Sequence, residues 1–465
     1  MRQKLILSLL CGAISCGSMG CMGYHRKPIV DRQVLRDLQA IRLEGLGMAE
    51  GKRDETAPRV DAAKSLSLEE AVAVGLYLNP DLRAFRKEKG VAEGELVSAR
   101  LLPNPEIQAA ALWNLFGAGG GIGSGSFAAL VAPFRPGERS ARTERARARI
   151  AETSSLIAGQ EWKLAADVKK AYLTLWALEE QLKLDDAAVR LQERILKFFQ
   201  EKRQLGDASR LDLNLVTIEY TQALRQREVT TGERDRARQA LLELLGLPPL
   251  YELSLKEPSD PLAYRAFHLE PAAMESLMIE RRPQLAAAKQ EYEQAEQDLR
   301  LAYIQRIPWF RLGPSYEQES GGGEGRVNRL GAALGLDLPL FNRNQGAIAS
   351  LEANREKLRE GYTAKVHAAR AELNESYRNL RAQERLIHLY QDTIKPALDE
   401  NVELTESGFE VREFNLIQLI TTQDKVLKAR RDFVSSELEY WMAATDLEVA
   451  VGARLSEAEK TKGQP

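Results

Sequence analysis

Side chains that could perform catalysis or hold a metal ion are few and widely spaced in this sequence. The four histidines, His25, His268, His367 and His388, lie far apart. They leave little material for a metal site or a general base. The sequence also contains no nucleophile–base set, phosphate-binding loop or Cys/His metal spacing. We therefore expect no enzyme, no bound cofactor and no metal site.

The first 21 residues are typical of an export signal. Arg2 and Lys4 form a basic start, an apolar run covers residues 5–10, and small residues follow. The three cysteines of the chain, Cys11, Cys16 and Cys21, all fall in this segment. The mature chain would keep at most one of them, so no internal disulfide framework is expected.

Cysteine chemistry in this segment points to a lipid anchor. Ser18-Met19-Gly20-Cys21 resembles a bacterial lipobox, with serine where leucine is usual. Ala13-Ile14-Ser15-Cys16 is a weaker competitor, and plain cleavage without lipid is the alternative. We expect the lipid on Cys21. No other segment approaches the ~20 apolar residues that a transmembrane helix needs, so any membrane-spanning part must consist of strands.

Composition favours long helices over compact mixed domains. Charged residues make up 28% of the 465 residues and aromatic residues only 6%. The formal net charge of −2 argues against a nucleic-acid surface. Length alone would allow about three ordinary domains.

Residues 137–205 are predicted to form one uninterrupted helix that would span roughly 100 Å. Apolar residues recur every seven positions in two offset rows, which is the pattern of a helix-packing seam. The first row is Ile150, Ile157, Leu164, Ala171 and Leu178; the second is Val168, Leu175, Leu182, Val189 and Leu196. A turn at Gly206 and a returning helix to about Leu245 are expected to follow.

A strand hairpin is expected before this helix. Residues 105–116 and about 126–134 alternate between apolar and polar side chains, and a glycine-rich loop separates them. Their lengths approach the ~9–11 residues needed to cross a bilayer within a barrel. In isolation the same pattern would fit a soluble hairpin.

The same order of elements then repeats. Strands are predicted at about 309–319 and 329–340, and a second long helix at about 345–411, bent at Pro396. Landmarks recur at a nearly constant offset: Pro80 with Pro283, Pro105 with Pro308, Pro133 with Pro339, and Gly246 with Gly452. The chain therefore contains a duplicated helix–hairpin–long helix–helix unit.

This duplication divides the chain into six segments. They are the signal peptide 1–21, an irregular tail 22–64, the first repeat 65–246, a proline-rich equatorial connector 247–271, the second repeat 272–452 and a polar tail 453–465.

Four strands from one chain cannot close a barrel. An open strand edge in lipid leaves unsatisfied backbone groups that cost several kcal/mol each, so other copies must complete the sheet. Three copies would supply twelve strands, enough to enclose a lumen. Their helices would extend that barrel into a tube. The expected fold is therefore mainly α with one β-hairpin per repeat, and the expected function is a conduit.

Between about Leu66 and Gly452 the sequence resembles the TolC-like outer membrane factor family. The resemblance rests on Leu68-Glu69-Glu70-Ala71 with Asn79-Pro80-Asp81-Leu82, on Leu102-Pro103-Asn104-Pro105-Glu106, and on residues 338–346, Leu-Pro-Leu-Phe-Asn-Arg-Asn-Gln-Gly. It implies a homotrimer with a twelve-stranded outer-membrane barrel and a periplasmic helical barrel. Its partners would be a periplasmic adaptor and an inner-membrane transporter. The last motif most resembles the heavy-metal cation efflux branch.

The same resemblance places the seal of the duct at the two helix–helix turns. Gly206 matches the family's turn glycine, and Asp212 matches a position where the family often has an acid. In the second turn Arg412 replaces the glycine, and Glu413 follows it. Gln418 and Thr421 occupy positions where some relatives place acids around the aperture. For each charged tip residue a solvated surface role remains an equal alternative.

Three other functions stay open at this point. A type I secretion duct or a drug efflux duct would use the same fold. A periplasmic coiled-coil scaffold would use the helices alone, but it would not need four strands placed symmetrically between them.

Overall fold

The computed structural model describes residues 24–43, 48–49, 52–53, 65–113, 122–256, 262–320, 326–410 and 416–460. The chain divides into two units, one ending at Arg42 and the other beginning at Leu43. In the smaller unit, α2 (Asp31–Gln39) buries none of its residues. In the larger unit, β1 (Met48–Ala49) and β2 (Lys52–Arg53) form a short antiparallel pair.

The first repeat begins with three short helices and continues with two long ones. They are α3 (Leu68–Leu78), α4 (Pro80–Arg86), α5 (Glu88–Arg100), α6 (Glu138–Gln204) and α7 (Arg210–Leu245). Ser67 starts α3 with a capping box to Glu70. Asn79 caps α4 and also donates its amide N–H to the carbonyl of Leu244, at the end of α7. Both ends of this repeat therefore meet at Asn79.

The second repeat follows the same plan. Its helices are α8 (Pro271–Arg281), α9 (Pro283–Ile304), α10 (Gln345–Leu389), α11 (Lys395–Glu410) and α12 (Leu416–Val451), and the short α13 (Leu455–Lys460) follows the repeat. A π-helical turn, η1 (Tyr390–Ile394), separates α10 from α11. Proline at 396 has no N–H for the carbonyl of Asp392, and its ring clashes with that carbonyl. The predicted bend at Pro396 is therefore a π turn directly before it.

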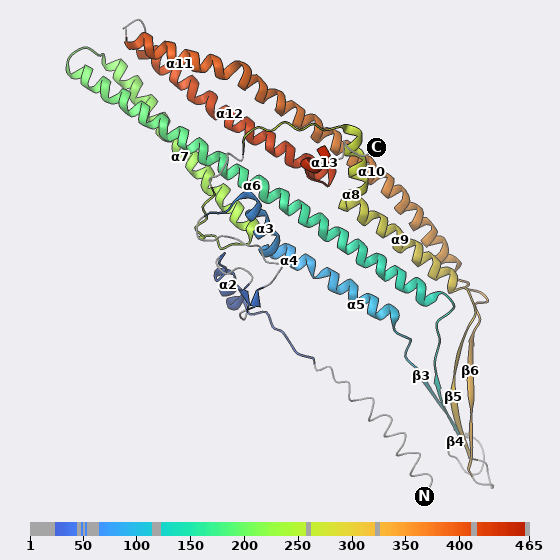
Figure 1. Cartoon of the computed structure of the whole chain (residues 1–465). Coiled ribbons are helices and arrows are strands. Elements are labelled where there is room, and N and C mark those ends of the chain that lie inside the picture. Colours follow the sequence, from blue (N-terminus) through green and yellow to red (C-terminus); the bar gives the residue numbers. More distant parts are fainter. Residues whose placement is uncertain are drawn as a thin grey trace. The chain divides into compact units, whose positions relative to one another are not determined.

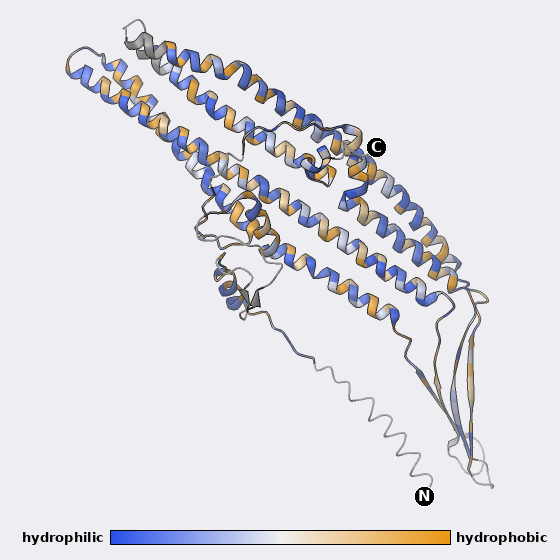
Figure 2. Cartoon of the chain, viewed as in Figure 1, coloured by the Kyte–Doolittle hydropathy of each residue, from blue (hydrophilic) through white to orange (hydrophobic). Residues whose placement is uncertain are grey.

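The long helices form a layer in the order α7, α6, α12, α11 (Figure 1). Apolar and polar residues alternate along α6 over its whole length (Figure 2). Its predicted seven-residue rows bury Ile157, Val168 and Leu175. A second core surrounds α8, α10 and α12, where Met278, Ile387 and Leu447 are fully buried. No helix among the described residues is both long and apolar enough to cross a membrane.

Four antiparallel strands extend from the ends of the helices in the order β3-β4-β5-β6 (Figure 1). Their bounds are Glu106–Trp113, Ile122–Leu130, Trp309–Ser320 and Arg326–Asp337.

The predicted bounds of the two return strands are wrong. β4 begins at Ile122 rather than 126, because Gly125 and Ser124 pair with Ala111 and Leu112 although their composition is typical of a loop. It ends at Leu130 rather than 134. β6 covers Arg326–Asp337 instead of 329–340. Prolines at 133 and 339 cannot donate to a strand ladder, so both strands stop before them.

Candidate functional site

The four-stranded sheet has one mainly apolar and one mainly polar face. Directly paired residues of an antiparallel ladder point to the same side, so the pairings Ala109–Phe127, Phe127–Tyr316 and Tyr316–Leu330 define one face. That face also carries Ile107, Ala111, Ala129, Phe310, Leu312, Pro314, Ala332, Leu334 and Leu336. Its large side chains are exposed, with 84% of Leu330 and 68% of Leu334 accessible. A soluble protein would rarely leave such a face uncovered.

The opposite face holds all the charged side chains that the structure describes in these strands. Arg311 lies between Glu106 and Asp337, with N–O distances of 2.7 and 3.0 Å. These three residues join β3, β5 and β6 at the end of the sheet nearest the helices. Farther along, Arg329 pairs with Glu319 at 2.7 Å. The two faces therefore match what a strand needs when one side meets lipid and the other meets water.

Gly313 permits the two hairpins to join. A Cβ atom at this position would lie 1.7 Å from the carbonyl oxygen of Ala129 on β4. Next to it Pro314 has no N–H to donate, and the β4–β5 ladder resumes only at the Val131–Leu312 bridge. Sequence reasoning missed this contact, although a Gly-Pro pair inside a strand pattern is a signal of close backbone approach.

The first helix–helix turn lies at the opposite end of α6 from the strands (Figure 1). Gly206 adopts φ +85°, and the N–H of Asp207 donates to the carbonyl of Lys202, which closes the end of α6. Ser209 then starts α7 with a capping box to Asp212, whose carboxylate accepts the Ser209 hydroxyl at 2.6 Å. This hydrogen bond lowers the pKa of Asp212 below its ordinary value. Asp212 therefore has a local structural partner within its own turn.

The second turn lies partly outside the described residues. Arg412 and Glu413 are not described, and neither is Cys21. Gln418 and Thr421 both lie on α12, near its start at Leu416, with exposed side chains. A contact between these residues and the first turn stays a prediction.

A buried polar seam joins the two repeats along α6 and α12. Asp185 on α6 is fully buried; it forms an ion pair with Arg431 on α12 and accepts the hydroxyl of Thr230 on α7 at 2.6 Å. Nearby, Gln181 donates to Ser435 at 3.0 Å. Sequence reasoning missed this seam. The signal was present, because Asp185 occupies the next position of the apolar row that ends at Leu178. A polar residue in such a row fixes helix register.

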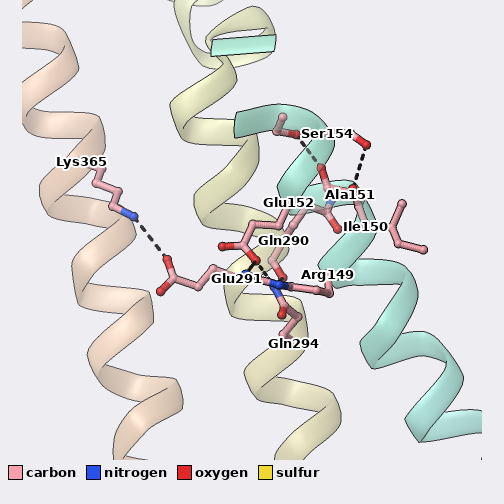
Figure 3. A network of polar contacts seen from close by, with 10 residues as sticks. Arg149, Ile150, Ala151, Glu152, Ser154, Gln290, Glu291, Gln294 and Lys365 are labelled. Atoms are coloured by element: carbon pink, nitrogen blue, oxygen red, sulfur yellow. Dashed lines mark hydrogen bonds and ion pairs between the residues drawn. The ribbon is translucent and has the colours of Figure 1, made fainter. Parts of the chain in front are cut away.

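Closer to the strands, the repeats are joined through α6, α9 and α10 (Figure 3). Glu152 on α6 pairs with Arg149 at 2.8 Å and accepts the amide of Gln294 on α9 at 2.6 Å. Glu291, also on α9, pairs with Lys365 on α10 at 3.4 Å. The helices that carry the strands are thus held by polar contacts as well as apolar ones.

No group of three or more His, Cys, Asp or Glu side chains that could hold a metal ion lies among the described residues.

Comparison with known proteins places these features in a family. The description "Outer membrane efflux protein" matches residues 76–247 and 275–453, one match in each repeat. The chain belongs to the outer membrane efflux protein family. It is therefore an efflux channel protein of the outer membrane, and the resemblance to TolC-like factors is confirmed.

The individual relatives have low sequence identity to this chain. The cobalt-zinc-cadmium resistance protein CzcC of Cupriavidus metallidurans is 23% identical over 84% of this chain and 91% of its own length. The pyoverdine export outer membrane protein OpmQ of Pseudomonas aeruginosa is 24% identical over 63% of this chain and 62% of its own. Among solved structures, CusC aligns with a TM-score of 0.70 at 16% identity, covering 83% of this chain and 92% of CusC. A membrane protein of Pseudomonas aeruginosa gives 0.69 at 19% identity, covering 93% and 97%.

Proposed function

We propose that this outer-membrane channel is the passive exit duct of a tripartite efflux system. The observation that carries the proposal is the two-faced sheet with unpaired outer edges on β3 and β6 among the described strands. An apolar face suits lipid, and a charged face suits a water-filled lumen. A duct of this kind does not power transport, so an inner-membrane transporter must supply the driving force and a periplasmic adaptor must join the two.

The open edges of the sheet support a homotrimer. Unpaired N–H and C=O groups cost several kcal/mol each in lipid, so β3 and β6 must pair with strands of other copies. Three copies with four strands each make a twelve-stranded barrel. In the same assembly the long helices would surround one periplasmic tube.

We propose heavy-metal cations as the cargo. The relative whose name contains cobalt, zinc and cadmium resistance aligns over 91% of its length, whereas the pyoverdine exporter aligns over 62% of its own. Drug efflux and type I secretion are the alternatives within the same fold. A metal ion here is cargo that passes through water, so the duct needs no resident metal site.

The experiment is deletion of the gene in its host, followed by growth with graded Co²⁺, Zn²⁺ and Cd²⁺ and, separately, with a panel of drugs. Metal export predicts greater sensitivity to the cations, higher cellular metal content and unchanged drug sensitivity. Sensitivity to drugs alone would reject the metal cargo while keeping the duct. A strain with no change in either, in which the protein lies outside the outer membrane, would favour a scaffold.

The proposal also includes a lipid anchor at the N-terminus and a closed state of the duct at the helix–helix turns. Lipid on Cys21 would hold the N-terminus in the outer membrane. At the tips, Arg412 and Glu413 would lie opposite Gly206 and Asp212, with Gln418 and Thr421 nearby, and would close the duct at rest.

Conductance in planar bilayers tests the seal. We expect Arg412→Ala and Asp212→Ala each to raise conductance and the double variant to add little. Parental conductance in both single variants would leave these residues as surface charges.

For the lipid anchor, Cys21→Ser should abolish incorporation of labelled fatty acid. Unchanged labelling would mean that the lipid is attached to another residue.

A further inference from the structure

The strands join the helices through four short segments, which together we call the junction. They connect α5 with β3, β4 with α6, α9 with β5, and β6 with α10 (Figure 1). With the adjoining ends of these elements, the segments are residues 100–106, 131–139, 304–311 and 337–345. Each repeat therefore contributes two segments to the junction.

Side-chain contacts hold the four segments together. Arg135 in the second segment donates from Nε to the carbonyl of Ile307 in the third, at 3.2 Å. Asn344 in the fourth donates its amide N–H to the carbonyl of Ala302, near the end of α9, at 3.0 Å. The ion pairs that join β3, β5 and β6 add the first segment. The junction is therefore one connected region of the molecule.

Arginine is in excess at the junction. Its residues include six arginines and three carboxylates, with no lysine or histidine. The carboxylates, Glu106, Glu138 and Asp337, already pair with arginine. Each segment also contains one exposed arginine that forms no ion pair with any described residue. These are Arg100, Arg139, Arg306 and Arg343. The junction therefore presents four positive charges that its own carboxylates do not neutralise.

Exposed apolar side chains lie in the same region. Leu338, Leu340 and Phe341 follow the end of β6 and are 54%, 63% and 93% exposed. They come directly after the apolar residues on one face of β6, the last of which is Leu336. A surface that combines uncovered apolar groups with unpaired cations matches the boundary between the acyl chains and the phosphate groups of a phospholipid layer.

Phe341 lies in a turn whose polar groups are hydrogen-bonded within the turn itself. The side-chain amide of Gln345 donates to the carbonyl of Phe341 at 3.2 Å, and the N–H of Arg343 donates to Oε1 of Gln345 at 2.7 Å. The N–H of Asn344 donates to Oδ1 of Asn342 at 3.0 Å. Because these backbone groups already have partners, the turn can approach lipid without leaving them unsatisfied.

The first repeat has a corresponding phenylalanine that is covered. α6 and α10 each start after a residue with positive φ, Gly137 and Asn344, and a phenylalanine lies three residues before each. Phe134 is half-buried, and the guanidinium of Arg142 lies 5.3 Å from the centre of its ring. Phe341 has no such cation over its ring within the described part of the chain. Its exposure is therefore particular to the second repeat.

We propose that the junction binds the phospholipid layer on the helix side of the outer membrane and selects anionic lipids. The four unpaired arginines bind phosphate groups, while Leu340 and Phe341 enter the boundary with the acyl chains. β5 and β6 have 12 residues each, slightly more than the ~9–11 that cross a bilayer within a barrel, so their helix-side ends lie at a membrane surface. The inference uses the outer-membrane location and is independent of the proposed trimer and cargo.

Lipid selection tests the arginines. The purified protein is reconstituted in phosphatidylcholine vesicles with a trace of spin-labelled phosphatidylglycerol or, separately, spin-labelled phosphatidylcholine. An anionic lipid at an unpaired arginine should be preferred by about fivefold, so phosphatidylglycerol should be enriched among the lipids that the protein immobilises. Replacing all four arginines of the junction by glutamine should abolish this enrichment. Replacing them by lysine should keep it, because lysine retains the charge.

The matched control removes the same charge elsewhere. It replaces by glutamine four exposed arginines of α6 and α7 that form no ion pair with a described residue. They are Arg190, Arg194, Arg210 and Arg225. This control should keep the enrichment. Equal loss in the control, equal loss with lysine at the junction, or full enrichment in the glutamine variant would each overturn lipid selection by the junction.

Depth in the bilayer tests Phe341. A bimane dye on Phe341→Cys should be quenched by lipids that carry a nitroxide near the headgroup and only weakly by iodide in water. The matched control is Leu250→Cys in the connector, because Leu250 is 94% exposed and should respond to iodide alone. The parental chain, labelled in the same way, gives the background from Cys21. Quenching of position 341 by iodide alone would place the turn in water and overturn its contact with lipid, while leaving the exit duct unaffected.

Discussion

The two repeats are alike at their ends and differ in the middle. α6 runs for 67 residues without interruption, whereas its counterpart in the second repeat is divided into α10, the π turn η1 and α11. Both repeats nevertheless close with a left-handed glycine, Gly246 at φ +70° and Gly452 at φ +76°. The two repeats therefore end in the same way, but α6 is continuous, whereas its counterpart is interrupted by the π turn η1. We call this interruption the joint.

The joint lies where α10 and α11 pack against α12 within the second repeat. Tyr390, the first residue of η1, is buried and stacks on Phe433 of α12. A π turn adds one residue per turn and rotates the side chains that follow. The side chains of α11 are therefore rotated about the helix axis relative to those of α10.

The largest effect is expected where the two repeats meet. Arg431→Leu would leave the fully buried Asp185 without its ionic partner, which costs about 3–5 kcal/mol. The measurement is the free energy of unfolding of the detergent-solubilised protein in urea. Arg430→Leu, at an adjacent exposed position, is the matched control and should change stability little. Equal losses in the two variants would mean that the buried pair does not hold the repeats together.

Introducing a proline into α6, at the position that corresponds to Pro396, tests whether the two long helices differ in rigidity. Arg190, an exposed residue of α6, is the counterpart of Pro396 in the first repeat. Arg190→Pro should cost about 3 kcal/mol or more, because it removes a hydrogen bond inside an uninterrupted helix. Arg190→Ala, the control, should be nearly neutral. If α6 accepts proline without loss, the two long helices do not differ in rigidity.

The reverse change should stiffen the second repeat. Pro396→Ala restores an N–H and a better helix former, so amide hydrogen exchange between residues 390 and 400 should slow. Exchange in α6 serves as the internal reference. Unchanged exchange in 390–400 would show that the π turn does not depend on the proline.

The glycines that end the two repeats should respond alike to substitution by alanine. A Cβ atom at Gly246 would lie 2.9 Å from the carbonyl oxygen of Leu78, and one at Gly452 would lie 2.9 Å from Cα of Arg282. Gly246→Ala and Gly452→Ala should each cost about 2 kcal/mol, from the left-handed backbone and the contact together. Gly206 also has positive φ but open space around it, so Gly206→Ala should cost less, about 1 kcal/mol. Thermal unfolding measures all three, and a larger loss at Gly206 would contradict this order.

The smallest effect concerns the capping box at the first tip. The pKa of Asp212 is lowered by its hydrogen bond to Ser209, so its contribution is present above the ordinary carboxyl pKa and is lost as pH falls through the lowered value. A nitroxide at Asp207→Cys should become more mobile over that acidic range. In Asp212→Asn its mobility should stay constant with pH. A pH response in both proteins would assign the change to another group.

Much of this fold could be predicted from local patterns. Ser67 with Glu70 marks a helix start in any context, and the seven-residue rows around Ile157 mark a packed helix. The strand faces followed from alternation alone. The glycine-rich start of β4 could not be placed, because Gly125 is in a strand only through its pairing with Ala111 on β3 and Gln318 on β5. A glycine-rich composition predicts a loop, because glycine is conformationally free. Pairing with the neighbouring strands nevertheless holds these residues in a strand.

The functional contacts were harder to predict, for a physical reason. Asp185 could be noticed as a polar residue in an apolar row, but its partner Arg431 lies far along the chain and becomes a neighbour only through the packing of α6 on α12. Asp212 shows the opposite case. Its partner Ser209 is three residues away, so the capping box can be read from the sequence.

The left-handed glycines have a consequence for the origin of the molecule. Gly246 lies against Leu78 and Pro80, and Gly452 lies against Arg281 and Arg282, so each repeat closes on its own first helices rather than on those of the other. A gene half this length would already encode a self-closing unit with one hairpin and one pair of long helices. Six such units would supply the twelve strands that the proposed trimer of longer chains needs. Joining the two units in one chain allows them to differ, and they do: α6 is uninterrupted, whereas its counterpart is divided by η1 before Pro396.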